Sequence, residues 1–465
     1  MRRVLLCLFI ATSTLMAGCL GNGEGIAGKE KVAPIFDDYI MIDEAAHGDS
    51  REFITIDLRT NETTNTTWAV FNKDYGGNCC EHYIATTIEG DIMNIGGEYP
   101  VYTEDRGHAW DTYIPGVLPD TQCRTFVPTN PGQEGLGEGS IVQATNGDII
   151  SMTWFPYIGA DGKIDKFYAL LYDDSEEEWK WCYNRLTEPF YDRSWQVEVV
   201  GPISSSLGSG DWASIIVSNF WHQTQNAGGQ ISVDGLNYYP FQFPNRGGGD
   251  PSIELDLNFT EAGLSAYYDV NKPHKEMRSF PFPSGGLLFP NYYDNGNAAY
   301  MDTTLSWNEL EVQFPSEYCQ IDSTGSIHCM KNTGTDFTHF ISYDGANTWQ
   351  NYTYQMGNFS TSIEEWEFQA NGELDLFVLN IRYQSSEGPD VDMVYHVRGY
   401  SEDMSPDTLT YIGAGDLDST SGAGNDIRFD FASLAILSDG GVVVAFHDST
   451  DVDPLFAVEL ELPQY

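Results

Sequence analysis

Short apolar stretches of this chain alternate with polar residues, and a glycine turn separates one stretch from the next. The pattern of strand, glycine turn and strand recurs at 83–95, 140–154, 252–268, 318–329, 365–378 and 433–446, with a poorer copy at 211–218. Five copies place the turn glycine seven residues after the first strand residue, whereas the copy at 252–268 has a longer loop. Few windows carry apolar residues at the three- and four-residue steps of a helix. We therefore expect an all-β protein.

Copies of this size suit a β-propeller, because a small antiparallel unit cannot bury both of its faces alone. A chain of 465 residues is also too long for one sandwich. We expect four-stranded antiparallel blades, seven according to the number of copies, or six if the regions around residues 211 and 250 form one blade. After the last hairpin only the stretch 454–462 remains as a strand candidate. We expect the N-terminal stretch 52–58 to complete this blade and close the ring, which removes exposed sheet edges.

A second pattern, Ser/Thr-x-Asp-x-Gly-x-Thr-Trp, follows several of these hairpins. The matching residues are Thr103, Asp105, Gly107 and Trp110 at 103–110, Ser232 and Asp234 at 232–239, and Ser342, Asp344 and Trp349 at 342–349. The last two copies have their glycine one place earlier, and 172–179 is a degraded copy. In these features the chain resembles the Asp-box (BNR) propellers of the sialidase-like superfamily, from about Glu81 to the C-terminus.

The resemblance implies that the Asp-box turns lie on the outer rim of the propeller. Their aspartates can cap the N–H groups of a tight turn, and the glycine permits a positive φ. The final aromatic residue can pack between neighbouring sheets. We therefore interpret the Asp-box residues as structural rather than catalytic.

Ligands of propellers bind around the starts of the inner strands, and this chain has an acid at each of these places. The candidates are Glu81, Glu138, Asp211, Asp250, Glu317, Glu364 and Asp430. A ring of carboxylates would concentrate cations and raise the pKa values of its own members. The alternative is chance, because the chain has 69 acidic residues.

Sialidases hold the substrate carboxylate with three arginines and use a Tyr–Glu pair with an acidic residue for the reaction. This chain has no Phe/Tyr-Arg-Ile-Pro motif, and only Arg246, Arg382 and Arg428 lie near strand entries. We therefore favour a surface-tethered module that recognises a glycan or protein, with a sialidase-like exo-glycosidase as the alternative. No cofactor motif is present. The acidic cluster at 448–453 could hold Ca²⁺ through oxygen ligands.

The first residues predict an export signal with a lipid anchor. Arg2 and Arg3 precede an apolar stretch that is too short to cross a bilayer. The stretch ends in Leu-Met-Ala-Gly-Cys, which resembles the lipobox of prokaryotic lipoproteins and implies acylation of Cys19. We expect a signal peptide at 1–18, a flexible tether at 19–33 and one propeller domain at 34–465. The protein would then sit on the cell surface, on the extracytoplasmic side of the membrane.

The charge of the chain changes the list of partners. The 22 Lys+Arg and 69 Asp+Glu residues give a formal net charge of −47, which repels nucleic acid and anionic headgroups. A coat of this kind is typical of salty surroundings, where screening weakens the self-repulsion. Sequons at Asn61, Asn65, Asn258, Asn351 and Asn358 fit an exported protein.

The cysteines also fit an oxidising compartment, because six remain after Cys7 and Cys19. Cys319 and Cys329 are equally distant from Thr324 at the centre of a predicted turn, so they should face each other across a hairpin. We expect a disulfide bond between them. Cys79 and Cys80 could pair with Cys123 and Cys182 in either order.

Overall fold

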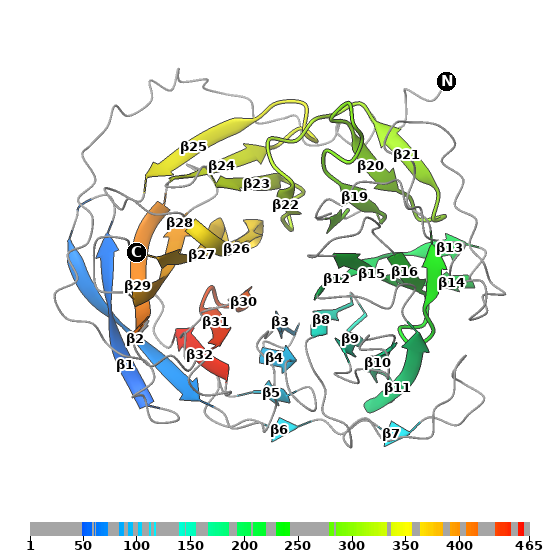
Figure 1. Cartoon of the computed structure of the whole chain (residues 1–465), viewed down its shortest axis with the longest axis horizontal. Coiled ribbons are helices and arrows are strands. Elements are labelled where there is room, and N and C mark those ends of the chain that lie inside the picture. Colours follow the sequence, from blue (N-terminus) through cyan, green and yellow to red (C-terminus); the bar gives the residue numbers. More distant parts are fainter. Residues whose placement is uncertain are drawn as a thin grey trace, which may run out of the picture.

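The chain is an all-β protein whose sheets lie around a common centre in the propeller arrangement, as the computed structural model shows (Figure 1). The structure describes residues 49–57, 60, 62–72, 83–87, 92–95, 101–104, 111–112, 116–117, 139–144, 146–154, 166–185, 193–205, 208–219, 229–241, 279–282, 285–332, 336–355, 363–384, 391–399, 406–416, 433–447 and 454–459. The only helix within these ranges is the short 3₁₀ helix η5 (Gly372–Leu374). In the same ranges, no helix has the length and apolarity needed to span a membrane.

Within the residues that the structure describes, four sheets contain four antiparallel strands each, as expected for propeller blades. The first holds β3 (Tyr83–Thr86), β4 (Ile92–Ile95), β5 (Val101–Thr103) and β6 (Asp111–Thr112). The second holds β12 (Arg193–Val200), β15 (Ala213–Asn219), β16 (Gly229–Ser232) and β17 (Tyr239–Phe241). The third holds β18 (Phe280–Pro281), β19 (Leu287–Phe289), β20 (Ala298–Met301) and β21 (Trp307–Leu310). The fourth holds β22 (Tyr318–Ile321), β23 (Ile327–Asn332), β24 (Asp336–Ser342) and β25 (Gln350–Gln355).

The remaining described strands form three further sheets. A five-stranded sheet contains β8 (Gly139–Gln143), β9 (Ile149–Trp154), β10 (Lys166–Asp173), β11 (Glu178–Arg185) and, parallel to β11, β7 (Gly116–Val117). A small hairpin pairs β13 (Ile203–Ser205) with β14 (Gly208–Gly210). The nine-stranded sheet has β26 (Ile363–Asn371), β27 (Leu376–Gln384), β28 (Val391–Gly399) and β29 (Pro406–Asp416) at one side. Its other side has β30 (Ser433–Ile436), β31 (Val442–His447) and β32 (Pro454–Glu459).

The N-terminal strands join these two sides. β1 (Asp49–Asp57) pairs with β29, and β2 (Thr63–Asn72) pairs with β32. The prediction that the stretch at 52–58 would pair with the C-terminal strand is therefore wrong in one detail. Because β1 and β2 form a hairpin, the second strand of that hairpin reaches β32.

Five of the predicted hairpins are confirmed by strand pairing, namely β3–β4, β8–β9, β22–β23, β26–β27 and β30–β31. Several share one turn, in which the glycine N–H bonds the carbonyl three residues earlier, as at Gly147, Gly325 and Gly440. Their φ angles of 96°, 88° and 86° explain the recurring glycine. The hairpin predicted at 252–268 lies outside the described residues.

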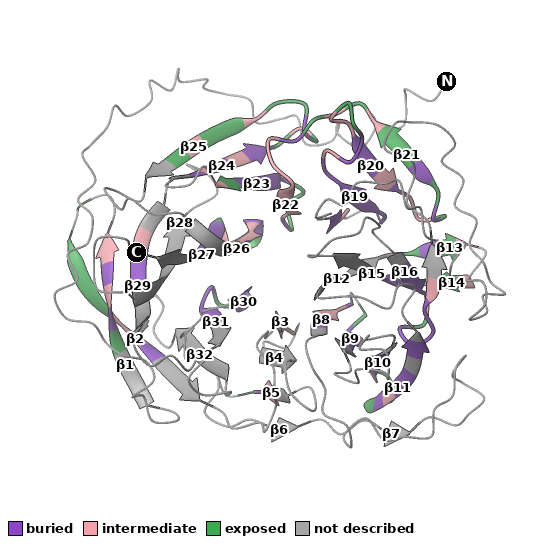
Figure 2. Cartoon of the chain, viewed as in Figure 1, coloured by how far each residue is buried: buried purple, intermediate pink, exposed green. Residues whose placement is uncertain are grey.

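Many strand residues are buried (Figure 2), and apolar side chains of neighbouring sheets pack against one another. Between the sheets β18–β21 and β22–β25, Phe280, Phe314, Ile327 and the Cys319–Cys329 pair are buried. Trp349 packs on Phe314 from the outer side, with ring centroids 5.7 Å apart. Each sheet therefore depends on its neighbours for the burial of its faces.

The predicted Cys319–Cys329 disulfide bond is confirmed. The two residues are direct cross-strand partners in β22–β23, with Cα atoms 4.1 Å apart. Cys182 is also disulfide-bonded. Cys79, Cys80 and Cys123 lie outside the described residues, so the order of the other pairing stays a prediction.

Candidate functional site

Strands β22 and β26 lie next to each other at the inner side of their sheets, and one glutamine fastens them together (Figure 1). The side-chain amide of Gln320 donates to the carbonyl of Phe368 at 2.6 Å and accepts from the N–H of Ala370 at 3.3 Å. Tyr318, two residues earlier, contacts Trp366. A later residue of β22 contacts a later residue of β26, since Tyr318 meets Trp366 and Gln320 meets Phe368 and Ala370. The two strands therefore run in the same direction, and their first residues lie at the same end of the molecule.

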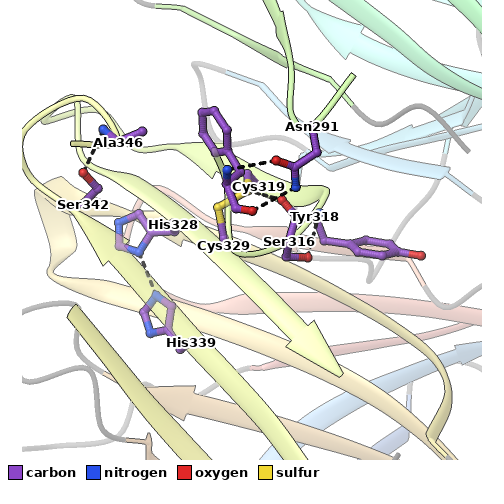
Figure 3. The surroundings of a disulfide bond; sticks show 10 residues. Asn291, Ser316, Tyr318, Cys319, His328, Cys329, His339, Ser342 and Ala346 are labelled. Carbon is purple, nitrogen blue, oxygen red and sulfur yellow. Dashed lines mark hydrogen bonds between the residues drawn. A yellow bond between two sulfur atoms is a disulfide. The ribbon is translucent and has the colours of Figure 1, made fainter. Parts of the chain in front are cut away.

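An aromatic cluster lies at these starts. The rings of Tyr318 and Trp366 are 4.4 Å apart between centroids, and both side chains are only partly buried. Trp366 rests on two rings beneath it, Phe337 at 5.5 Å and Phe368 at 6.0 Å, which are buried. The Tyr318 ring points away from the Cys319–Cys329 disulfide, toward the opposite face of its sheet (Figure 3). The arrangement offers partly exposed aromatic surface on a rigid base.

Two of the predicted acids are close to this cluster in the sequence. Glu317 directly precedes β22 and is half-buried. Glu364 is the second residue of β26, at the bulge where the register with β27 shifts between Ile363 and Glu365. Bulges of this kind change the direction of a strand and of its side chains. Glu81, Glu138, Asp250 and Asp430 lie outside the described residues, so a ring of acids stays a prediction.

Asp211 does not lie where the sequence placed it. It precedes β15, and the inner strand of this sheet is β12, which contacts the inner strands β8 and β18 of the neighbouring sheets. Because β12 and β15 are antiparallel, Val200 at the end of β12 pairs with Ala213 at the start of β15. Asp211 is therefore exposed near the end of an inner strand, away from its start.

The turn at Ser232 and Asp234 is closed by the aspartate. Oδ1 of Asp234 accepts the N–H groups of Leu236 at 2.9 Å and Asn237 at 2.7 Å, and the Ser232 hydroxyl donates to it at 2.8 Å. Oδ2 accepts the Asn237 amide at 2.9 Å. These bonds engage both carboxylate oxygens in capping.

The turn at Ser342 and Asp344 has the same construction. Asp344 accepts the N–H of Thr348 at 2.8 Å and its hydroxyl at 2.7 Å, while the Ser342 hydroxyl accepts the N–H of Ala346 at 2.9 Å. Burial opposes ionisation, but the hydrogen bonds from Thr348 and Ser342 outweigh it and lower the pKa of Asp344. Trp349 follows the turn and packs between sheets. Of the first predicted copy, Thr103 is buried, whereas Asp105, Gly107 and Trp110 lie outside the described residues.

Sequence reasoning missed a buried polar chain between the sheets. Nε2 of His328 and Oδ2 of Asp322 are 2.9 Å apart. On the other side of the ring, Nδ1 of His328 lies 2.9 Å from Nε2 of His339 (Figure 3). The three residues are 4% (Asp322), 0% (His328) and 3% (His339) exposed. Burial opposes ionisation of Asp322, yet the hydrogen bonds from His328, Thr324 and Ser326 lower its pKa to about 2.

The pairing register of β23 with β24 is the signal that could have identified this row of hydrogen-bonded side chains. The histidines are eleven residues apart on adjacent strands, and the aspartate sits in the turn that precedes the first of them. Among the residues that the structure describes, no three His, Cys, Asp or Glu side chains have the arrangement of a metal site. Arg382 lies in β27. Arg246, Arg428 and the cluster at 448–453 lie outside the described ranges.

Two of the predicted sequons are on described strands. Asn65 in β2 and Asn351 in β25 are both exposed. The Asn65 amide donates to Glu52 at 3.0 Å. The sequons at Asn61, Asn258 and Asn358 lie outside the described residues, and glycosylation stays a prediction.

No protein-family model matches the chain, and no curated protein matches it. Among solved structures the chain is similar to NanB with optactamide, at 13% identity and a TM-score of 0.31 over 89% of this chain and 68% of that one. It is also similar to an α-L-arabinanase of Penicillium chrysogenum with arabinobiose, at 11% identity and a TM-score of 0.36, over 88% of this chain and 99% of that one. The polysaccharide lyase Uly1 is similar at 10% identity and a TM-score of 0.37, over 84% of this chain and 91% of that one. Likenesses this low carry no argument about what this chain binds or catalyses.

Proposed function

We propose that this chain recognises an extracellular glycan at the starts of its inner strands, without turning it over. The observation that carries the proposal is the Tyr318–Trp366 pair, whose rings are partly exposed and lie on two adjacent inner strands. Binding sites combine aromatic surface with a few polar groups that fix orientation. Glu317, next to Tyr318, supplies a carboxylate that can accept hydrogen bonds from sugar hydroxyls.

Replacing Trp366 by alanine should weaken glycan binding at least about tenfold, because buried aromatic anchors dominate most interfaces. A glycan array identifies the probe, and titration of the best hit compares the two proteins. Trp349→Ala is the matched control, since Trp349 is also partly buried and packs on a neighbouring ring, but on the outer turn. Equal binding by wild type and the Trp366 variant would contradict the proposal.

Two further experiments separate the glycan proposal from its alternatives. Chromogenic glycosides incubated with and without Ca²⁺ test for an exo-glycosidase, and hydrolysis would overturn the claim of binding without turnover. An array without hits, together with capture of a protein partner that Trp366→Ala abolishes, would replace the glycan by a protein ligand. Both outcomes contradict the proposal as stated.

We also propose seven blades. The inner strands would be β3, β8, β12, β18, β22, β26 and β30, and each of them contacts the next, with β30 contacting β3. In this assignment the nine-stranded sheet comprises two blades that are joined through β1 and β2. The β2–β32 pairing supports closure of the last blade by an N-terminal strand.

Export and a lipid anchor at Cys19 are the remaining parts of the proposal. Residues 1–48 lie outside the described residues, so the support is the sequence pattern alone. Mass spectrometry of the mature protein should find an N-terminus at Cys19 carrying acyl chains, and Cys19→Ser should leave the protein unacylated. A mature N-terminus elsewhere, or an unmodified Cys19, would refute the anchor but not the glycan site.

A further inference from the structure

Strand β25 lies at the outer side of the ring, and among the described strands it pairs only with β24 (Figure 1). An unpaired strand edge presents N–H and C=O groups that can pair with a strand of another molecule. Gln350, Asn351 and Thr353 are all exposed (Figure 2). The first half of this edge strand is thus open to solvent.

Outer strands elsewhere in the described part of the ring have features that prevent such pairing. β6 has only two residues, β17 contains Pro240, and β21 carries the exposed Glu309. β7 pairs with β11, and β1 pairs with both β29 and β2. Short strands, proline, charged side chains and covering strands all hinder edge-to-edge pairing.

Strand β25 has none of these protective features. Its six residues, Gln-Asn-Tyr-Thr-Tyr-Gln, include no charge and no proline, and its register with β24 is regular. The run of sequence 345–363, which includes β25, has no charged residue, although 20% of the chain is charged. Among the described residues, Tyr343 in the preceding turn is the one large hydrophobic side chain that is exposed, at 55%. Local charge repulsion therefore does not protect this edge, despite the net charge of −47.

The same strand carries an exposed sequon, because Asn351, Tyr352 and Thr353 match Asn-x-Ser/Thr. Asn351 and Thr353 are two residues apart on one strand, so their side chains lie on the same face of the sheet, and both residues are exposed. Among the described residues, none binds the Asn351 side chain. The other sequon on a described strand differs, since the Asn65 amide donates to Glu52 at 3.0 Å. Asn351 is therefore the asparagine that is open to modification.

We propose that Asn351 is N-glycosylated and that its glycan covers the edge of β25. Nδ2 of Asn351 forms a bond to the anomeric carbon of a glycosyl phosphate donor supplied by the exporting cell. The bond from that carbon to the phosphate oxygen breaks, and this oxygen takes the proton that Nδ2 loses. A glycan is bulky and solubilising, so at this position it keeps a second strand away from the edge. The site lies on the outer strand, away from the inner strand β22, and does not depend on glycan recognition by the chain (Figure 1).

Mass spectrometry of the protein extracted from its source organism tests the site. Chymotryptic cleavage after Trp349 and Tyr354 gives a peptide with this sequon alone. We expect a glycan on this peptide in wild type and in Thr353→Ser, and its complete loss in Asn351→Gln and Thr353→Ala. Asn65→Gln is the matched control, because it removes the other sequon on a described strand and should leave the Asn351 glycan in place. An unmodified Asn351 in the wild-type protein would overturn the proposal.

Sedimentation velocity at matched protein concentrations tests the role of the glycan. Asn351→Gln should shift to larger species than wild type, because its bare, uncharged edge can pair with a second copy. Asn351→Glu also lacks the glycan but should sediment like a wild-type protein, since a carboxylate then protects the edge, as Glu309 does on β21. Equal sedimentation of all three proteins would overturn the claim that the glycan covers the edge. Association of wild-type protein through an unmodified β25 would identify a second copy as the occupant of the edge and would also overturn the proposal.

Discussion

Replacing Gly285 by alanine should destabilise the protein by at least about 3 kcal/mol in urea unfolding. Gly285 lies in the turn between β18 and β19 at a φ of +87°. An added Cβ atom would lie 2.3 Å from the carbonyl oxygen of Gly201 and 2.5 Å from Cγ2 of Thr303. The first of these atoms belongs to the backbone directly after β12 of the neighbouring sheet, so relief requires that backbone and the β18–β19 turn to move apart.

Gly325→Ala is the control for the backbone conformation. Gly325 has the same place in the same kind of turn and a φ of +88°, but its added Cβ atom would meet nothing within 4 Å. The loss should be about 1 kcal/mol, the cost of a left-handed non-glycine residue alone. Equal losses in both variants would show that the close approach of the sheets at Gly285 contributes nothing.

The sequence was sufficient to predict the local hairpins that recur along the chain. Alternating apolar residues around Gly147, Gly325 and Gly440 predict hairpins because the turn needs a positive φ that favours glycine. The Cys319–Cys329 disulfide follows from the same symmetry, since a hairpin fixes which residues face each other. These predictions depend on contacts within about ten residues, where the turn sets the register.

Predictions about position around the ring were weaker, because they depend on contacts between sheets. The small hairpin β13–β14 lies between the inner strand β12 and its partner β15 in place of a tight turn, so the sequence assigned the inner position to β15 and placed Asp211 at the wrong end. The partnership of Tyr318 with Trp366 joins residues of different sheets. Single-strand periodicity contains no information about such pairs.

The polar chain was missed for a related reason. His328 and His339 appear as scattered histidines in the sequence, and only the register of β23 with β24 brings them together. Asp322 looks like an ordinary turn residue, and its Oδ1 atom does cap the turn. Its second oxygen has a different role, which depends on the fold of two further strands.

Removal of the Asp322 carboxylate should have the other large effect. In Asp322→Ala the N–H of Ser326 and Nε2 of His328 lose a buried acceptor, at 2.9 Å each, and the Thr324 hydroxyl loses one at 2.6 Å. Breaking a buried, hydrogen-bonded pair of this kind costs about 3–5 kcal/mol. Urea unfolding near neutral pH measures the loss, with Asp439→Ala, at an exposed aspartate of the β30–β31 turn, as the control.

Acid titration gives the same carboxylate a second, independent signature. The pKa of Asp322 falls from 3.8 to about 2 on folding, so its ionised form stabilises the protein above pH 3.8 and this stabilisation is lost as the pH falls towards 2. The lost stability is about 2 kcal/mol. Asp322→Asn keeps the shape but does not titrate, and its unfolding free energy should therefore fall less than that of wild type over this interval. Parallel curves for the two proteins would mean that the carboxylate is not held ionised by His328, Thr324 and Ser326.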